Sequence, residues 1–293
     1  MDNLKNRKNK IFSIQCICMQ GIRKWLSDYR IYLLFLLEFT VIFSKTREMV
    51  TPFLKNDLGI NGFGVFPVLY NNQVGIFRFI FMFGIILLYC DAPFFDKNQQ
   101  FLFLRAGRTI WNLGQLFYIF VSAFLYLFLN VLVSILSCLP NLGFSFYFWG
   151  EAFWEMISID METVIVSSDF LLKYTPWQAF YHGLFVIFLF TLFMGYFIYT
   201  LSLLFSRGIG IFAGSFIVCG STIIELLSDS NQKSNLSYIF PAFMTKIIHI
   251  DTENIGGYPS YHYIYLFFTI SIVIFILLSL FQGKKTEMNT INS

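Results

Sequence analysis

Two arginines and a tryptophan form the group of residues whose types and spacing first suggest a function. Arg105 and Arg108 lie three residues apart in a polar interruption between two apolar runs, and Trp111 follows them. Residues three apart share one face of a helix. The spacing therefore predicts a short amphipathic helix at a membrane boundary, with its charges available to a soluble partner. The alternative interpretation is an ordinary basic loop that obeys the positive-inside rule.

Glu38 is the second candidate because it stands between Leu37 and Phe39 in the middle of an apolar run. A charge inside a bilayer is costly unless it meets water or a polar partner. Two interpretations follow from this position. Glu38 faces a cargo path, or it forms an intramembrane ion pair or polar contact with a neighbouring helix.

Enzyme chemistry finds little support in the sequence. Glu151 and Glu155 lie four residues apart and could form a paired-carboxylate site, but an acidic solvated loop is favoured. The histidines and cysteines are scattered without metal-ligand spacing, so no metal site is predicted. No G-x-x-x-x-G-K-[ST] phosphate loop occurs. We therefore expect a protein that is not an enzyme and binds no cofactor itself, and any ATP that drives it is bound by another chain.

Composition indicates a membrane protein. The 293 residues are 57% hydrophobic and only 13% charged, whereas a soluble domain averages about 25% charged residues. So few charges cannot cover a water-soluble surface of this size. The net charge of +3 is too small to indicate nucleic acid as a partner.

Apolar runs long enough to cross a bilayer, which takes roughly 20 residues, divide the chain. They predict an all-α membrane protein with six transmembrane helices, of which the first is the shortest. The predicted spans are residues 31–44, 74–89, 116–139, 180–205, 209–227 and 263–281. Between them, three outer segments are expected to form short helices on or within the outer leaflet: residues 45–73, 140–179 and 228–262.

The N-terminal segment, residues 1–30, begins with basic residues and continues as an amphipathic pattern. Apolar side chains recur at helical spacing from Ile11 to Trp25. A basic helix with a tryptophan is typical of the membrane interface. A signal peptide is the alternative, but Ser13, Gln15 and Gln20 interrupt its apolar core and no small-residue cleavage site follows. We favour an interfacial helix.

Lysine and arginine placement predicts the orientation. With the N-terminus inside, thirteen of the 20 basic residues fall on the cytoplasmic side, as the positive-inside rule requires. Both termini and the segment 91–115 are then cytoplasmic. Ser206, Gly210 and Gly214 repeat at four-residue spacing, which allows close helix approach in a membrane. This stripe predicts a packing contact, within the chain in preference to a dimer seam.

The polar interruption also carries a family resemblance. Ala92-Pro-Phe, Leu104-Arg-Ala-Gly-Arg108, Trp111 and Gly114-Gln115 resemble a segment of ABC-2-type membrane permeases, mainly of Gram-positive bacteria. In that family the segment follows the second transmembrane helix and resembles the coupling helix that docks on the ATPase subunit. The resemblance is local, and the layout of the whole chain supports it.

The resemblance implies one transmembrane permease domain over residues 1–293, with a cytoplasmic coupling helix between spans two and three. Arg105, Arg108 and Trp111 would dock on an ABC ATPase subunit, which would bind ATP and Mg²⁺. A second permease copy or a homologous permease, and membrane lipid, would be the other partners. The expected location is the bacterial plasma membrane.

The resemblance also implies export of an amphipathic substrate such as an antimicrobial peptide or a lipid. The alternative function is an ATP-independent channel, transporter or immunity-type peptide-binding protein, which would use the acidic outer loops to capture a cationic peptide.

Overall fold

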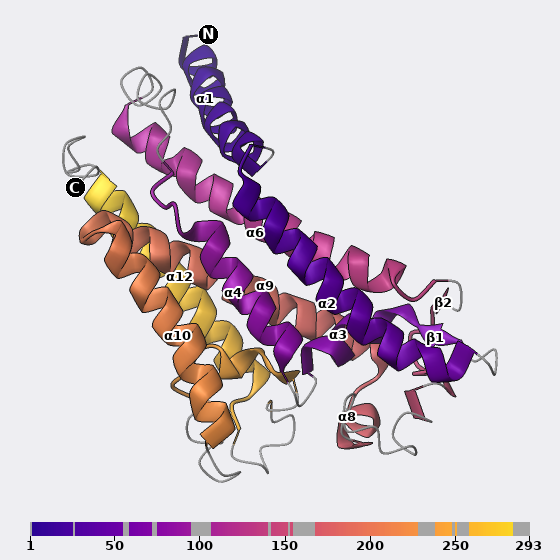
Figure 1. Ribbon diagram of the computed structural model, residues 1–293. Helices are drawn as coiled ribbons and strands as arrows, with labels where there is room; N and C mark the ends of the chain where they lie inside the picture. Colours follow the sequence, from indigo (N-terminus) through magenta and orange to yellow (C-terminus); the bar gives the residue numbers. More distant parts are fainter. Residues whose placement is uncertain are drawn as a thin grey trace.

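Helices account for most of the structure. It is a computed structural model that describes residues 2–25, 27–54, 59–71, 75–94, 107–139, 142–151, 153–154, 168–227, 238–247, 250 and 258–283. Within these residues the elements are α1 (Asp2–Trp25), α2 (Tyr29–Leu54), β1 (Ile60–Asn61), α3 (Gly62–Asn71), α4 (Ile76–Tyr89), α6 (Arg108–Leu136), β2 (Leu142–Gly143), α8 (Ser168–Lys173), α9 (Pro176–Leu204), α10 (Arg207–Leu227), η1 (Phe243–Thr245) and α12 (Tyr261–Gly283). Figure 1 shows their arrangement.

α9 is the central helix of the bundle, and α3, α4, α6, α10 and α12 all pack against it. It begins with a capping box in which Thr175 and Gln178 satisfy each other's backbone N–H groups, and Pro176 occupies its first position. Within an apolar 18-residue stretch of each helix, 72% of α9 is buried but only 17% of α12. α9 is apolar on all sides and largely buried, so it forms the core of the bundle.

Three of the described helices, α6, α9 and α12, are each long and apolar enough to cross a membrane. A fourth crossing is possible if α3 and α4, which meet at a bend of 85°, form one broken span. Each of the six predicted apolar ranges coincides largely with a helix, and residues 31–44 lie within the longer α2. The all-α class with membrane-length helices is confirmed, whereas six crossings remain a prediction.

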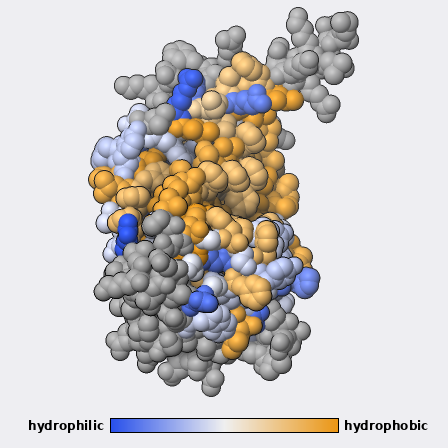
Figure 2. Space-filling view, turned by 90° about the vertical axis from the view of Figure 1, so that its right-hand side faces the viewer, coloured by the Kyte–Doolittle hydropathy of each residue, from blue (hydrophilic) through white to orange (hydrophobic). Residues whose placement is uncertain are grey.

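The outer surface of the bundle has the apolar character of a lipid-facing protein. Hydrophobic side chains gather in the middle of the face in Figure 2, and hydrophilic ones lie mostly toward its two ends. Exposed aromatic residues recur along α6 at Phe117, Phe120, Phe124 and Phe128. Their three- and four-residue spacing places them on one face of that helix.

α1 forms a helix, as the amphipathic pattern predicts, and it packs along α6. Gly21 lies against the Tyr118 ring, and Gly114 lies against Ile17. Positions four residues apart on α1 thus meet positions four residues apart on α6, so the two helices run side by side in the same direction (Figure 1). Cys18 and Trp25 of the predicted apolar stripe are buried, whereas Ile11 is exposed. The position of α1 at a membrane interface remains a prediction.

The cytoplasmic segment predicted over residues 91–115 needs a correction at its C-terminal part. Residues 108–115 are the first turns of the long helix α6, not part of a separate short helix. The helix begins directly after Gly107, whose φ of 84° is a conformation that glycine adopts easily. The middle of the segment, residues 95–106, lies outside the described residues.

The end of the bundle opposite Asp91 is closed by short elements from all three predicted outer segments. α3 is buried along almost its whole length despite Pro67 inside it. Its Tyr70 hydroxyl donates to Thr245 Oγ1 at 3.1 Å, and the backbone N–H of Ile247 donates to Asn71 Oδ1 at 2.8 Å. β1 and β2 join in a two-residue parallel ladder, which the all-α prediction did not include. Helices within these segments are confirmed.

Candidate functional site

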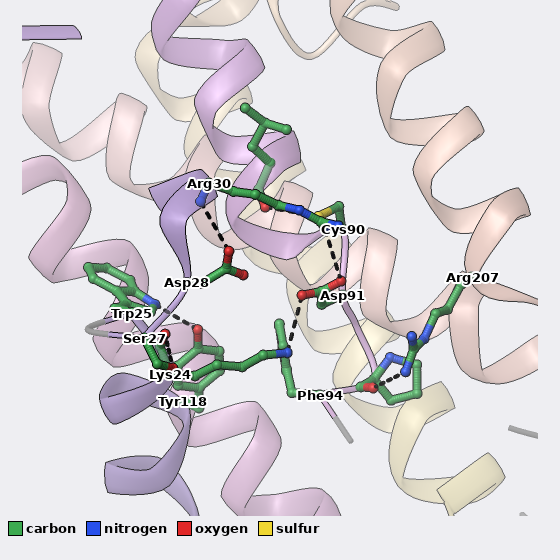
Figure 3. Close-up of polar contacts among 12 residues, drawn as sticks. Lys24, Trp25, Ser27, Asp28, Arg30, Cys90, Asp91, Phe94, Tyr118 and Arg207 are labelled. Atoms are coloured by element: carbon green, nitrogen blue, oxygen red, sulfur yellow. Dashed lines mark hydrogen bonds and ion pairs between the residues drawn. The ribbon is translucent and has the colours of Figure 1, made fainter. Parts of the chain in front are cut away.

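The first candidate site is the junction around Asp91, where α4 ends. Its carboxylate contacts two cations, with 3.1 Å from Lys24 Nζ to Asp91 Oδ2 and 3.7 Å from Arg30 Nη1 to Asp91 Oδ1. Lys24 belongs to the last turn of α1 and Arg30 to the first turn of α2. Figure 3 shows that both side chains converge on Asp91 from the same turn. One carboxylate thus joins three helices.

The turn between α1 and α2 is held by local hydrogen bonds. Asp28 caps α2, since its Oδ1 accepts the backbone N–H of Arg30 at 3.0 Å. The Ser27 hydroxyl donates to the Lys24 carbonyl at 3.0 Å, which satisfies a carbonyl at the end of α1. These bonds fix the directions in which Lys24 and Arg30 leave the turn, and so they position both cations on Asp91.

Behind the ion pairs, the junction is apolar and buried. Trp25 Nε1 donates to the Tyr118 hydroxyl at 2.8 Å, which ties α1 to α6. The Tyr118 ring packs edge-on against Phe94 at 4.6 Å between ring centres. Gln115 Nε2 donates weakly to the Phe94 carbonyl at 3.5 Å. Phe94, three residues after Asp91, therefore packs against α6.

α10 reaches the same place from the other side. Arg207 Nη2 donates to the Pro93 carbonyl at 3.3 Å, and the Arg207 side chain points at this carbonyl in Figure 3. The start of the segment that leads from α4 to α6 therefore contacts α1, α2, α6 and α10. Any displacement of that segment would act on all four helices.

A cavity of about 20 Å³ lies inside the junction, lined by Lys24, Asp28, Arg30, Asp91 and Tyr118 among others. This volume suffices for about one water molecule. Next to it, burial and the nearby Asp91 carboxylate raise the pKa of the Cys90 thiol. A protonated thiol is a poor nucleophile, so the raised pKa does not favour Cys90 as a nucleophile.

The three residues predicted to dock on an ATPase fall in different environments. Arg105 lies outside the described residues. Arg108 is exposed at the first position of α6. Trp111 is only 2% exposed, so its ring packs in the interior near the base of α6. Of the two described residues, Arg108 is the one that is accessible on the surface. The docking role of Arg105, Arg108 and Trp111 remains a prediction.

The second candidate site surrounds Glu38, which is 1% exposed on α2. The Tyr126 hydroxyl is in hydrogen-bond contact with Glu38 Oε1, and Asn130 Nδ2 donates to Glu38 Oε2 at 3.0 Å. Both partners come from α6 and lie four residues apart on one face. Among the described residues the ion pairs are those of Asp91. Two hydrogen-bonding groups, not a cation, therefore hold Glu38, and its role in a cargo path remains a prediction.

α4 closes this second site with a glycine. A Cβ atom at Gly84 would lie 2.5 Å from Glu38 Oε1 and 2.9 Å from Leu34 Cδ1, and it would also meet the Tyr126 hydroxyl. The Tyr126 hydroxyl additionally donates to the Phe81 carbonyl of α4 at 2.8 Å. Only a residue without a side chain leaves room for the carboxyl and phenol groups between α2, α4 and α6.

The predicted small-residue stripe lies where α9 turns into α10. The backbone N–H of Gly210 donates to the Ser206 carbonyl at 3.2 Å, so Ser206 begins the first turn of α10. A Cβ at Gly210 would lie 2.8 Å from the Ile198 carbonyl, and one at Gly214 would lie 2.9 Å from Ile198 Cδ1. Both glycines therefore allow close contact between α10 and α9 within the chain.

Sequence reasoning missed Tyr126 and Asn130 as partners of Glu38, and it assigned no role to Asp91. The signal for the first two was present. Ser122, Tyr126, Asn130 and Ser134 recur every four residues in the apolar run 116–139, which places polar groups on one face of a helix. All four are buried. No comparable periodicity connects Asp91 with the distant Lys24.

Across the described residues no group of three or more His, Cys, Asp or Glu side chains could hold a metal ion. No protein-family model matches the chain, and no curated protein matches it either. The resemblance of residues 92–115 to ABC-2-type permeases therefore stays a prediction. The geometry describes two polar centres in an apolar helical bundle, one at its end and one in its interior.

Proposed function

We propose that this chain is the membrane-spanning permease subunit of an ABC-2-type transporter, driven by ATP hydrolysis in a separate ATPase subunit. The observation that carries the proposal is the junction around Asp91. The segment that resembles the coupling helix starts at a residue bound to α1 and α2. Its C-terminal part, residues 108–115, forms the first turns of α6. A coupling segment must pass movement to several helices, and this connection supplies the means.

Movement would pass through contacts at both ends of the segment. At the start, Lys24 and Arg30 hold Asp91, and Arg207 holds the Pro93 carbonyl. At the far end, residues 108–115 of the segment are part of α6, which begins directly after Gly107. Nucleotide-driven closure of two ATPase subunits would press on this segment and shift α1, α2, α6 and α10 together as a rigid-body transition.

The topology follows from the same proposal. Six crossings would place both termini, the Asp91 junction and Arg108 on the cytoplasmic side of a bacterial plasma membrane. In support, Asn112 near the start of α6 donates to the Ser279 carbonyl near the end of α12 at 2.7 Å. α1 and the end of α12 also lie at the same end of the molecule (Figure 1). A second permease copy would complete the path for an amphipathic cargo.

Charge reversal tests the docking role. The double variant Arg105→Glu and Arg108→Glu, tagged and purified in mild detergent, is expected to lose its ATPase partner while inserting normally into the membrane. Reversing two charges replaces attraction with repulsion at the contact, which mainly weakens association. The matched control is Arg23→Glu, an exposed arginine of α1 outside the segment, which should retain the partner.

Two outcomes would count against the proposal. Co-purification of the ATPase at wild-type stoichiometry with the double variant would remove the coupling role from these arginines. Absence of any ATPase from wild-type preparations in several detergents would favour the ATP-independent channel, transporter or peptide-binding protein.

A further inference from the structure

Among the described residues, no cation forms an ion pair with Glu38. Its side chain is 1% exposed, and the ion pairs of the described residues lie at Asp91. Taking an ionised carboxylate out of water costs several kcal/mol even after relaxation. Donors around such a group would have to offset that cost. Whether the site can hold an ionised carboxylate therefore depends on how many hydrogens its neighbours can donate.

If Glu38 is ionised, the side chains around it have one hydrogen too few for the observed contacts. The amide of Asn130 has two hydrogens, and they go to Glu38 Oε2 at 3.0 Å and to the Tyr126 carbonyl at 3.1 Å. The Tyr126 hydroxyl has one hydrogen but two oxygen neighbours, Glu38 Oε1 and the Phe81 carbonyl. A phenol donates only once and also accepts. Both contacts are hydrogen bonds at the same time only if the carboxyl group donates one of them.

We propose that Glu38, Tyr126 and Asn130 form a proton-binding site between α2, α4 and α6, in which Glu38 is a neutral carboxylic acid that donates to Tyr126. Tyr126 then donates to the Phe81 carbonyl, and Asn130 donates to the other carboxyl oxygen. With that proton in place, no charge is buried in the site. The ligand of the site is the proton itself, so the inference is independent of the ATPase partner.

If Glu38 lost its proton, the titratable side chains that face it in the described helices would not neutralise the negative charge. The titratable groups that face the site across the described helices are phenols: Tyr126 itself, with Tyr70 of α3 and Tyr89 of α4 acting on it. The cation of α4, Arg78, interacts with Tyr70. Loss of the proton would leave a carboxylate among these groups, and α4 approaches it so closely that a Cβ at Gly84 would lie 2.5 Å from Glu38 Oε1. The three helices would then have to separate to hydrate the charge, so the proton holds α2, α4 and α6 together.

Infrared spectroscopy of the purified full-length protein tests the protonation state. Exposed carboxyl groups ionise near pH 4, so a carboxylic-acid carbonyl band that persists at about pH 7 must come from a buried acid. We expect this band in the wild type, its loss in Glu38→Gln, and its retention in the control Glu151→Gln, which changes an exposed residue. Identical acid bands in the wild type and Glu38→Gln at that pH would overturn the proposal.

Stability gives a second readout that does not depend on assigning a band. Glutamine is neutral and can donate to Tyr126 and accept from Asn130 as the acid does, so Glu38→Gln should have wild-type stability at about pH 4, where Glu38 is largely protonated in the folded and the unfolded chain. Titration from about pH 4 to about pH 9 covers the range in which exposed and buried glutamates ionise. Above about pH 4 the unfolded chain releases the Glu38 proton and the folded chain keeps it, so the wild type should lose stability relative to Glu38→Gln as the pH rises, until the folded protein releases the proton too. Parallel curves would contradict a bound proton.

Tyr126→Phe keeps the test decisive if Glu38→Gln does not fold. Removing the phenol oxygen leaves the acid without its acceptor, so its carbonyl band should persist but shift in frequency. A band that is absent already in the wild type, or one that is unmoved by Tyr126→Phe, would show that Glu38 does not donate to Tyr126.

Discussion

Asp91 and Glu38 are two carboxyl groups in opposite surroundings. Glu38 belongs to α2, and Asp91 contacts Arg30 about two turns earlier on the same helix. Asp91 is one-third exposed and lies between Lys24 and Arg30. Glu38 is 1% exposed and lies between a phenol and an amide. The first joins helices through charge in the presence of water. The second joins helices through hydrogen bonds at a site that is buried from solvent.

The two surroundings determine how each contact responds to changes in salt concentration and pH. Partly exposed ion pairs are weak, screened by salt and easily rearranged, which suits the coupling role that we propose for the Asp91 junction. Buried polar contacts are stable only when every donor and acceptor is matched. The Glu38 site is therefore sensitive to shape and to the number of protons, and much less sensitive to salt.

The largest effect is expected from filling the space at Gly84. An alanine there would push the Glu38 carboxyl and the Tyr126 hydroxyl apart, and overpacking of this kind lowers the free energy of unfolding by about 1–3 kcal/mol. Gly220→Ala is the control, because a Cβ at that position meets nothing within 4 Å. It should be neutral or stabilising by up to about 1 kcal/mol, from helix propensity. Unfolding in mixed micelles measures both, and equal stabilities would contradict the close approach at Gly84.

A smaller effect is expected from the buried hydrogen bond beneath the Asp91 junction. Trp25→Phe removes the donor to Tyr118 and should lower the free energy of unfolding by about 1 kcal/mol. Tyr118→Phe removes the acceptor, so the double variant should be less destabilised than the sum of the two single variants. Trp154→Phe, at an exposed tryptophan, is the control. Strict additivity of the pair would show that the two side chains are not coupled.

The smallest effect is expected at the ion pair itself. Lys24→Met keeps the aliphatic stem and removes the charge that faces Asp91, which should change the free energy of unfolding by less than about 1 kcal/mol. Raising the salt concentration should increase amide hydrogen exchange in the turn around Ser27 and Asp28, and it should leave exchange around Glu38 unchanged. Salt-sensitive exchange at both places would remove the distinction between the two carboxyl groups.

The sequence predicted the helices because each depends on a local apolar run. Residues 74–89 and 209–227 correspond closely to α4 and α10. The start of α6 was misplaced because Arg108, Asn112 and Gln115 are polar, whereas Asn112 and Gln115 are buried there by hydrogen bonds to other parts of the chain. Periodicity within one segment cannot reveal partners that distant segments supply.

The two polar centres were predictable to different degrees. Glu38 was singled out because a carboxylate in an apolar run is conspicuous by itself. Its partners follow from the four-residue polar spacing on α6, but the choice of Tyr126 and Asn130 depends on the helix register. The Asp91 junction depends on where α1 ends and the chain turns into α2. The sequence around Asp91 contains no pattern that indicates this position.

The most direct test of the proposed function is affinity purification of the tagged wild-type protein from its native membrane in mild detergent, followed by mass spectrometry of the associated proteins. We expect a soluble subunit that carries a G-x-x-x-x-G-K-[ST] phosphate loop, present in stoichiometric amount. A preparation that is pure and folded but lacks such a subunit in every detergent tested would contradict the assignment as a permease subunit.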